Sequence, residues 1–203
     1  MQLPIEIDTV KGFMPADEGA CLYREALAMA PHGPCLEIGS YCGKSAVYLG
    51  AAIRSVGGVL FTVDHHRGSE ENQPGWDYFD DSLWDEEAGA LDTLPHLRRT
   101  LRRAGLEETV IPVIGASPTV ARHWRTPLAL LFIDGGHTMD HALADYRGWT
   151  PHLMRGGRLL IHDVFPDPAD GGRPPHEIYK LALASGLLAP RDAIGSLRVL
   201  ERI

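Results

Sequence analysis

Short apolar runs alternate with amphipathic stretches along most of the chain. Each run is bounded by Gly, Pro or Asp, which is typical of buried strands, whereas the stretches between them have helical periodicity. The predicted strands are residues 35–39, 59–64, 110–115, 128–134 and 158–163, and the predicted helices are residues 44–55, 90–104, 117–124, 139–153 and 177–185. This alternation indicates βαβ units, in which a parallel sheet carries helices on both faces.

The two ends of the chain depart from this alternation. Residues 1–30 form a helical segment before the first strand, and residues 186–203 contain two short strands joined by a turn. The second pattern predicts an antiparallel hairpin at one edge of the sheet. In "HLMRGG", residues 152–157, the glycines predict the end of the helix over residues 139–153.

Two segments between predicted elements are long or rich in loop-forming residues. Residues 65–89 are rich in Asp and Glu, carry two Trp and have little periodicity, so we expect a lid-like insertion. Residues 166–175 form a loop of Pro, Gly and Asp after the fifth strand. The remaining pattern fits a single domain over residues 1–203.

Composition narrows the class of protein. A chain of 203 residues with 44% hydrophobic content can bury one sizeable core. Its net charge of −8 argues against a nucleic-acid partner, and no signal peptide or apolar run long enough for a membrane span is seen, so we expect a cytoplasmic protein. The three cysteines include no CxxC pair, which predicts reduced and buried thiols.

The first predicted strand leads into a glycine-containing loop. "CLEIGSYCGKSAV" places Gly39 and Gly43 before an apolar helix, so a ligand can approach the backbone there. This GxxxG spacing differs from the GxGxxG of dinucleotide sites and from the P-loop. Asp64 ends the second strand, where an acid can accept hydrogen bonds from both hydroxyls of a ribose.

This order of loop and acid resembles the S-adenosylmethionine site of the class I methyltransferases. The resemblance implies an α/β, Rossmann-like, doubly wound and mostly parallel seven-stranded sheet with a C-terminal antiparallel hairpin. It places the methionine part near Gly39, the ribose at Asp64 and the adenine at residues 115–117. The implied cofactor contacts are Glu37, Gly39, Ser40, Tyr41, Gly43, Asp64, His65, Ser117 and Asp134.

Two further acids end neighbouring strands. Asp134 and Asp163 follow the fourth and fifth strands, which lie side by side in such a sheet, so their carboxylates should converge. Two facing carboxylates repel unless one is protonated or a cation lies between them. A hard divalent ion such as Mg²⁺, bound partly by the substrate, would lie between the two carboxylates and remove their repulsion.

The pattern "FIDGGHTMDHALADY" resembles the metal-dependent O-methyltransferases related to macrolide-sugar, cephalosporin-pathway and methylmannose-polysaccharide enzymes. The resemblance implies that Asp134 and Asp163 are metal ligands and that His137 is the general base. Where those enzymes have an acidic pair, this chain has His162 beside Asp163, so His162 is a further candidate ligand. Imidazole would favour Mn²⁺, Fe²⁺, Co²⁺ or Zn²⁺ over Mg²⁺.

The predicted function is therefore metal-assisted methyl transfer from S-adenosylmethionine to a hydroxyl of a saccharide or glycosylated metabolite. The acceptor would be a small molecule or an oligosaccharide, and a homodimer is compatible with the sequence. A catechol-type acceptor, a nicotinamide-dependent oxidoreductase and a non-catalytic cofactor-binding protein remain alternatives. A purely structural alternative is that Asp134 and Asp163 are turn residues and that His137 caps a helix.

Overall fold

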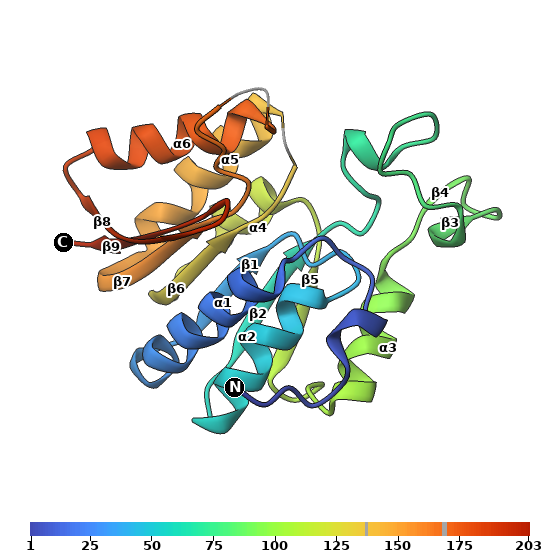
Figure 1. The fold of residues 1–203 in the computed structure, drawn as a ribbon, viewed down its shortest axis with the longest axis horizontal. Helices are drawn as coiled ribbons and strands as arrows, with labels where there is room; N and C mark the ends of the chain where they lie inside the picture. The colour runs from blue at the N-terminus through green and yellow to red at the C-terminus, as the bar shows by residue number, and fades with distance from the viewer. Residues whose placement is uncertain (137, 168–169) are drawn as a thin grey trace.

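The computed structural model describes residues 1–136, 138–167 and 170–203 and contains a seven-stranded sheet (Figure 1). Its order is β5-β2-β1-β6-β7-β9-β8, and the strands from β5 to β7 are parallel. The antiparallel β9 and β8 form the C-terminal hairpin, which confirms the predicted fold class. The strands are β1 (Cys35–Ile38), β2 (Leu60–Asp64), β5 (Val110–Ile114), β6 (Leu128–Ile133), β7 (Leu153–Ile161), β8 (Leu188–Ile194) and β9 (Leu197–Arg202).

Helices cover both faces of the sheet (Figure 1). Those on one face are α1 (Ala16–Met29), α2 (Lys44–Ser55) and α3 (Leu94–Ala104), and those on the other are α4 (Ser117–His123), α5 (Met139–Trp149) and α6 (Arg173–Ala184). Two apolar clusters fill the spaces between the sheet and these layers. Because both faces are covered, every residue of β1 and β6 is buried, which explains why both strands are apolar apart from Glu37 of β1.

The strand register sets the position of the functional site. Ile38, the last residue of β1, pairs with Ile133 of β6, which in turn pairs with Ile161 of β7. The residues that follow these three strands therefore lie together at the carboxyl ends of the parallel strands. The chain runs from β1 outward to β2 and β5, and then crosses back to β6 on the other side of β1. The strand order thus reverses between β1 and β6, and open α/β sheets bind ligands at such a switch point.

Three predicted helix boundaries were wrong. The helix predicted over residues 177–185 begins at Arg173, so the end of the predicted loop over residues 166–175 is helical. The helix over residues 139–153 ends at Trp149 and is followed by η5 (Thr150–His152), and β7 already begins at Leu153. Gly156 therefore lies within a strand and does not end the helix, because pairing of Leu153 with Leu128 extends β7 backwards. The helix predicted over residues 90–104 begins at Leu94, since Ala90–Leu91 pair as a short strand.

Residues 65–89 have partial local order. The segment contains η3 (Glu70–Asn72), η4 (Asp81–Leu83) and β3 (Trp84–Asp85), which pairs with β4 (Ala90–Leu91) beyond the end of the sheet (Figure 1). A small cluster of Cys42, Leu83 and Leu91 anchors it, and Phe79 and Trp84 pack against this cluster. Its lid-like action stays a prediction.

Two further sequence expectations concern thiols and membranes. All three cysteines are buried and carry free thiols, as predicted. Within the described ranges, none of the helices combines the length and apolar character that crossing a membrane would require.

Candidate active site

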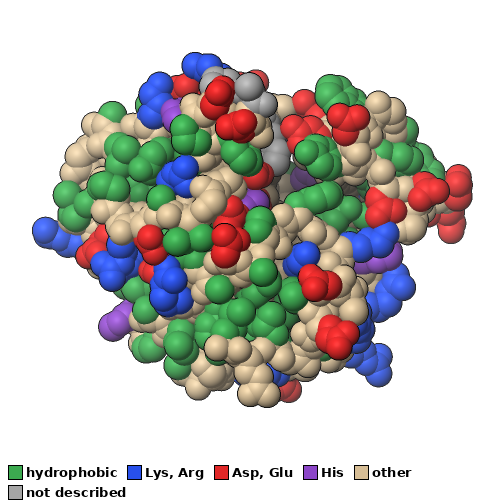
Figure 2. Space-filling view, in the orientation of Figure 1, with side chains coloured by type: hydrophobic (Ala, Val, Ile, Leu, Met, Phe, Trp, Pro, Cys, Tyr) green, Lys and Arg blue, Asp and Glu red, His purple; other side chains and the backbone are tan. Residues whose placement is uncertain are grey.

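A cavity of about 550 Å³ opens at the carboxyl edge of the parallel strands. Figure 2 shows the molecule hollowed here, with acidic and histidine side chains at the opening. Of the residues predicted from the sequence, the cavity is lined by Gly39, Ser40, Tyr41, Asp64, His65, Ser117, Asp134, His162 and Asp163. Glu37 and Gly43 are not among the described lining residues, and His137 lies outside the described residues.

Gly39 is required by a close approach of two loops. Its φ of 88° lies in the left-handed region, and a Cβ built there would lie 2.0 Å from the carbonyl oxygen of Asp134. No side chain fits at that distance, so glycine brings the β1–α2 loop against the segment after β6. Nearby, Ser40 also lines the cavity, and its buried hydroxyl has no hydrogen-bond partner among the described residues.

Asp64 holds the glycine loop through its backbone. Asp64 Oδ2 accepts hydrogen bonds from the amides of Ser40, at 3.0 Å, and Tyr41, at 2.9 Å. Its Oδ1 accepts from the amide of His66 at 2.7 Å. A carboxylate has about four acceptor sites, so Asp64 can still accept from a ligand hydroxyl in the cavity that it lines.

Glu37 is buried below the cavity. Its oxygens accept hydrogen bonds from Ser45 Oγ at 2.5 Å and Thr62 Oγ1 at 2.6 Å. Burial raises the pKa of the Glu37 carboxyl to about 7. Glu37 is not among the described lining residues, but its partner Ser45 is, so the cofactor contact of Glu37 stays a prediction.

The stability of the protein should depend on pH through Glu37. A folded-state pKa of about 7, above the ordinary 4.5, means that the folded chain binds this proton more tightly than the unfolded chain. Relative to Glu37→Gln, the wild-type free energy of unfolding should therefore decrease by roughly 3 kcal/mol as pH rises from 4.5 to 7. Chemical denaturation of both proteins across this range measures the difference. A difference that is constant with pH would contradict the expectation.

Ser117 belongs to a polar cluster that the sequence did not reveal. Its hydroxyl donates to Asp145 Oδ1 at 2.5 Å and accepts from Trp149 Nε1 at 2.8 Å. Asp145 is buried, lines the cavity and has its pKa raised to about 6 by burial. The sequence did contain one indication of this cluster, because Asp145 lies on the apolar face of α5, one turn from Ala142 and Trp149.

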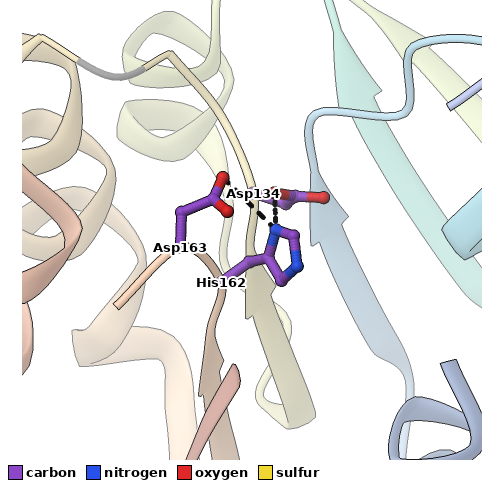
Figure 3. A group of neighbouring side chains, drawn as sticks. All are labelled: Asp134, His162 and Asp163. Carbon is purple, nitrogen blue, oxygen red and sulfur yellow. Dashed lines mark hydrogen bonds and ion pairs between the residues drawn. The ribbon is translucent and has the colours of Figure 1, made fainter. Parts of the chain in front are cut away.

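Asp134, His162 and Asp163 converge beside the cavity (Figure 3). His162 Nδ1 lies 2.9 Å from Asp134 Oδ1 and 3.4 Å from Asp163 Oδ2. One potential ligand atom from each residue lies within 4.8 Å of the others. Asp163 adopts a φ of 56°, an uncommon value for a residue with a side chain, so the surrounding structure holds it in a strained conformation.

The second ring nitrogen of His162 points away from these two acids (Figure 3). Nε2 lies 2.5 Å from Oε2 of Glu18, a buried residue of α1 that the sequence analysis did not identify. Burial lowers the pKa of His162, but the carboxylates around it, Asp134 first, raise the pKa more. Without a metal, the ring is therefore an imidazolium, and a bound metal would replace the proton on Nδ1.

Comparison with known proteins gives a family match over the same region. A family model described as a methyltransferase domain matches residues 36–164, more than half of the chain. This range spans β1 to the residues just after β7, and so contains the glycine loop, Asp64 and the three converging residues.

Several solved structures are similar over most of their length. Cofactor-bound Rv0187 from MTB has 16% identity and a TM-score of 0.67, over 97% of this chain and 85% of that one. An O-methyltransferase from Bacillus cereus in complex with SAH has 15% identity and a TM-score of 0.67, over 96% and 86%. The O-methyltransferase NovP has 16% identity and a TM-score of 0.67, over 90% and 79%. At these identities the likeness shows the fold.

Proposed function

The chain belongs to the methyltransferase-domain family, and on that premise we propose that it is an S-adenosylmethionine-dependent O-methyltransferase of small molecules. The observation that carries the proposal is the cavity at the strand ends, where the glycine loop and Asp64 adjoin two convergent carboxylates. Similar solved structures include O-methyltransferases described as complexes with SAH or SAM. The preferred acceptor is a hydroxyl of a saccharide or glycosylated metabolite.

The cofactor would lie across the switch point. Asp64 would accept hydrogen bonds from the ribose, Gly39 would admit the methionine part, and Ser117 would lie near the adenine. The unpartnered hydroxyl of Ser40 supports this placement, because a buried polar group without a partner is costly unless a ligand or water satisfies it.

Asp64→Ala should weaken binding of S-adenosylhomocysteine by roughly 1.5–3 kcal/mol, the range for hydrogen bonds to a charged acceptor. Part of this loss would come from the loop, because Asp64 also fixes the amides of Ser40 and Tyr41. Isothermal titration calorimetry measures the change, and circular dichroism checks that the fold is kept. Wild-type affinity in the variant would remove Asp64 from the cofactor site.

A divalent cation fits the three converging residues. Asp134 and Asp163 would contribute carboxylate oxygens and His162 would contribute Nδ1. The hydrogen bond between Nε2 and Glu18 is the arrangement by which proteins orient metal-binding histidines. Because one of the three ligands is an imidazole, the site suits Mn²⁺, Fe²⁺, Co²⁺ or Zn²⁺ better than a site made of oxygen ligands alone. When bound, the cation would orient the acceptor oxygen and stabilise its negative charge.

The protein itself would align the reactants and move one proton. The walls of the cavity would hold the acceptor and the methyl donor next to each other and exclude water. His137, assigned from the sequence alone, would take the hydroxyl proton as the oxygen attacks the methyl group. The methyl donor leaves as S-adenosylhomocysteine, and the acceptor leaves as a methyl ether.

A catechol-type acceptor is the second candidate. Phe13 and Tyr78 are exposed, line the cavity and lie with their ring centroids 5.2 Å apart. Tyr41 adds a third ring, 5.8 Å from Phe13. These aromatic faces could stack on a planar ring or on the apolar face of a sugar, and methylation assays with catechols and glycosides distinguish the two acceptor classes.

Thermal unfolding with and without ligands tests the proposed function. S-adenosylhomocysteine should raise the melting temperature, because a ligand that binds only the folded state stabilises it. NAD at the same concentration should leave it unchanged. Stabilisation by NAD instead would favour an oxidoreductase. A purified protein that binds S-adenosylhomocysteine but transfers no methyl group to any hydroxyl compound would favour a binding protein.

A further inference from the structure

Glu18 links three parts of the fold immediately behind the candidate metal site. Oε2 contacts Nε2 of His162 at 2.5 Å, whereas Oε1 accepts from the amide of Ser196 at 2.6 Å and from its hydroxyl at 3.1 Å. Both Glu18 and His162 are buried, with exposed fractions of 3% and 6%. Glu18 lies in α1, His162 follows β7, and Ser196 lies in the turn of the β8–β9 hairpin.

We propose that Glu18 is a positioning residue that selects the tautomer of His162 and thereby makes Nδ1 a metal ligand. This inference rests on the proposed metal site. An ionised carboxylate can only accept hydrogen bonds, so the nitrogen that faces Glu18 must carry the proton. Without a metal, Nδ1 also carries a proton, because it faces Asp134 and Asp163. When a cation bound by these two acids displaces that proton, Glu18 keeps the remaining proton on Nε2, and the lone pair of the neutral ring is on Nδ1.

The hairpin turn holds the Glu18 carboxylate in place. Gly195 has a φ of 52°, and a Cβ built there would lie 2.3 Å from Glu18 Oε1. The turn can therefore approach this closely only with glycine at position 195. Because both donors of Ser196 engage Oε1, rotation of the carboxylate would break two hydrogen bonds, and Oε2 stays directed at His162.

The anchoring at Ser196 makes glutamine an informative replacement. The amide of Ser196 is an obligatory donor, so in Glu18→Gln the side-chain oxygen would stay at Ser196. The NH₂ group would then face Nε2 of His162 and donate to it. The proton of the neutral ring would move to Nδ1, and this nitrogen could no longer bind a metal. The substitution thus reverses the tautomer without changing the size of the side chain.

Calorimetric titration with Mn²⁺ alone tests the proposal on the wild type, Glu18→Gln and Glu25→Gln. Glu25 is a matched control, because it is also a buried acid of α1 but pairs with Arg158 at 3.4 Å. The affinity for Mn²⁺ should fall about 10–100-fold in Glu18→Gln, the usual effect of losing the partner of a ligating histidine. Glu25→Gln should keep wild-type affinity. Binding of S-adenosylhomocysteine should be retained in both variants.

A measurement on the wild type covers the case in which Glu18→Gln does not fold. ¹⁵N NMR of histidine-labelled protein loaded with Zn²⁺, with His162 assigned by its loss in His162→Gln, should show a proton on Nε2 and none on Nδ1. A proton on Nδ1 would overturn the inference. Equal Mn²⁺ affinity in the wild type and a folded Glu18→Gln would overturn it while leaving the metal site intact. A wild type that binds S-adenosylhomocysteine but no divalent metal would refute both this inference and the metal site, without affecting the methyltransferase assignment.

Discussion

Asp134→Ala should abolish metal-dependent methyl transfer, with a loss of at least roughly 10²–10³-fold, the range for removing one group that stabilises a developing oxyanion. The substitution removes a carboxylate that faces Nδ1 of His162 at 2.9 Å. It keeps the Asp134 backbone, which is the part that packs against Gly39. The glycine loop should therefore keep its position against the segment after β6.

Steady-state assays with and without added Mn²⁺ or Mg²⁺, together with metal titrations, measure this effect. Asp140→Ala is the matched control, because Asp140 is an exposed acid only six residues away and is not among the described lining residues. It should keep wild-type rates. If EDTA leaves the wild-type rate unchanged, or if Asp134→Ala keeps normal turnover, Asp134 reverts to a residue of the turn after β6.

His137→Ala should slow methyl transfer by about 10²–10⁴-fold, the usual range for a lost general base, while keeping cofactor and metal affinity. This pattern differs from that of Asp134→Ala, in which metal binding is lost together with activity. The expectation comes from the position of His137 three residues after Asp134 in the sequence. Single-turnover kinetics with saturating cofactor and metal isolate the chemical step, and added imidazole should restore part of the rate.

His141 provides the competing hypothesis. It lies in α5, lines the cavity and could also accept a proton from an acceptor hydroxyl. If His141→Ala causes the large loss and His137→Ala does not, the base is His141. Normal rates in both variants would exclude a histidine base from this segment.

The sequence predicted the parts of the site that follow from strand order. Apolar runs that end in Asp64, Asp134 and Asp163 indicated strands whose carboxyl ends meet, and the register of β2, β1, β6 and β7 confirms that they do. The family match confirms the methyltransferase resemblance drawn from the glycine loop. These features were predictable because strand periodicity and chain connectivity are local properties of the sequence.

Glu18 could not be predicted in this way. In the sequence it is one of two acids in the first turn of an amphipathic helix, where acids are common because they favour the helix dipole. Its role depends on a contact across 144 residues to His162 and on the hairpin turn at Ser196. The start of β7 was missed for a similar reason, because the pairing of Leu153 with Leu128 is a tertiary effect.

The contacts of Glu18 with His162 and Ser196 affect how this protein could be shortened or recombined. The family match ends at residue 164 and begins at residue 36, so both α1 and the β8–β9 hairpin lie outside it. A protein engineered from the matched range alone would keep Asp134, His162 and Asp163 but lose both Glu18 and its anchor at Ser196. Chimaeras that exchange α1 between relatives would likewise need to exchange the hairpin turn with it, since the two segments share one carboxylate.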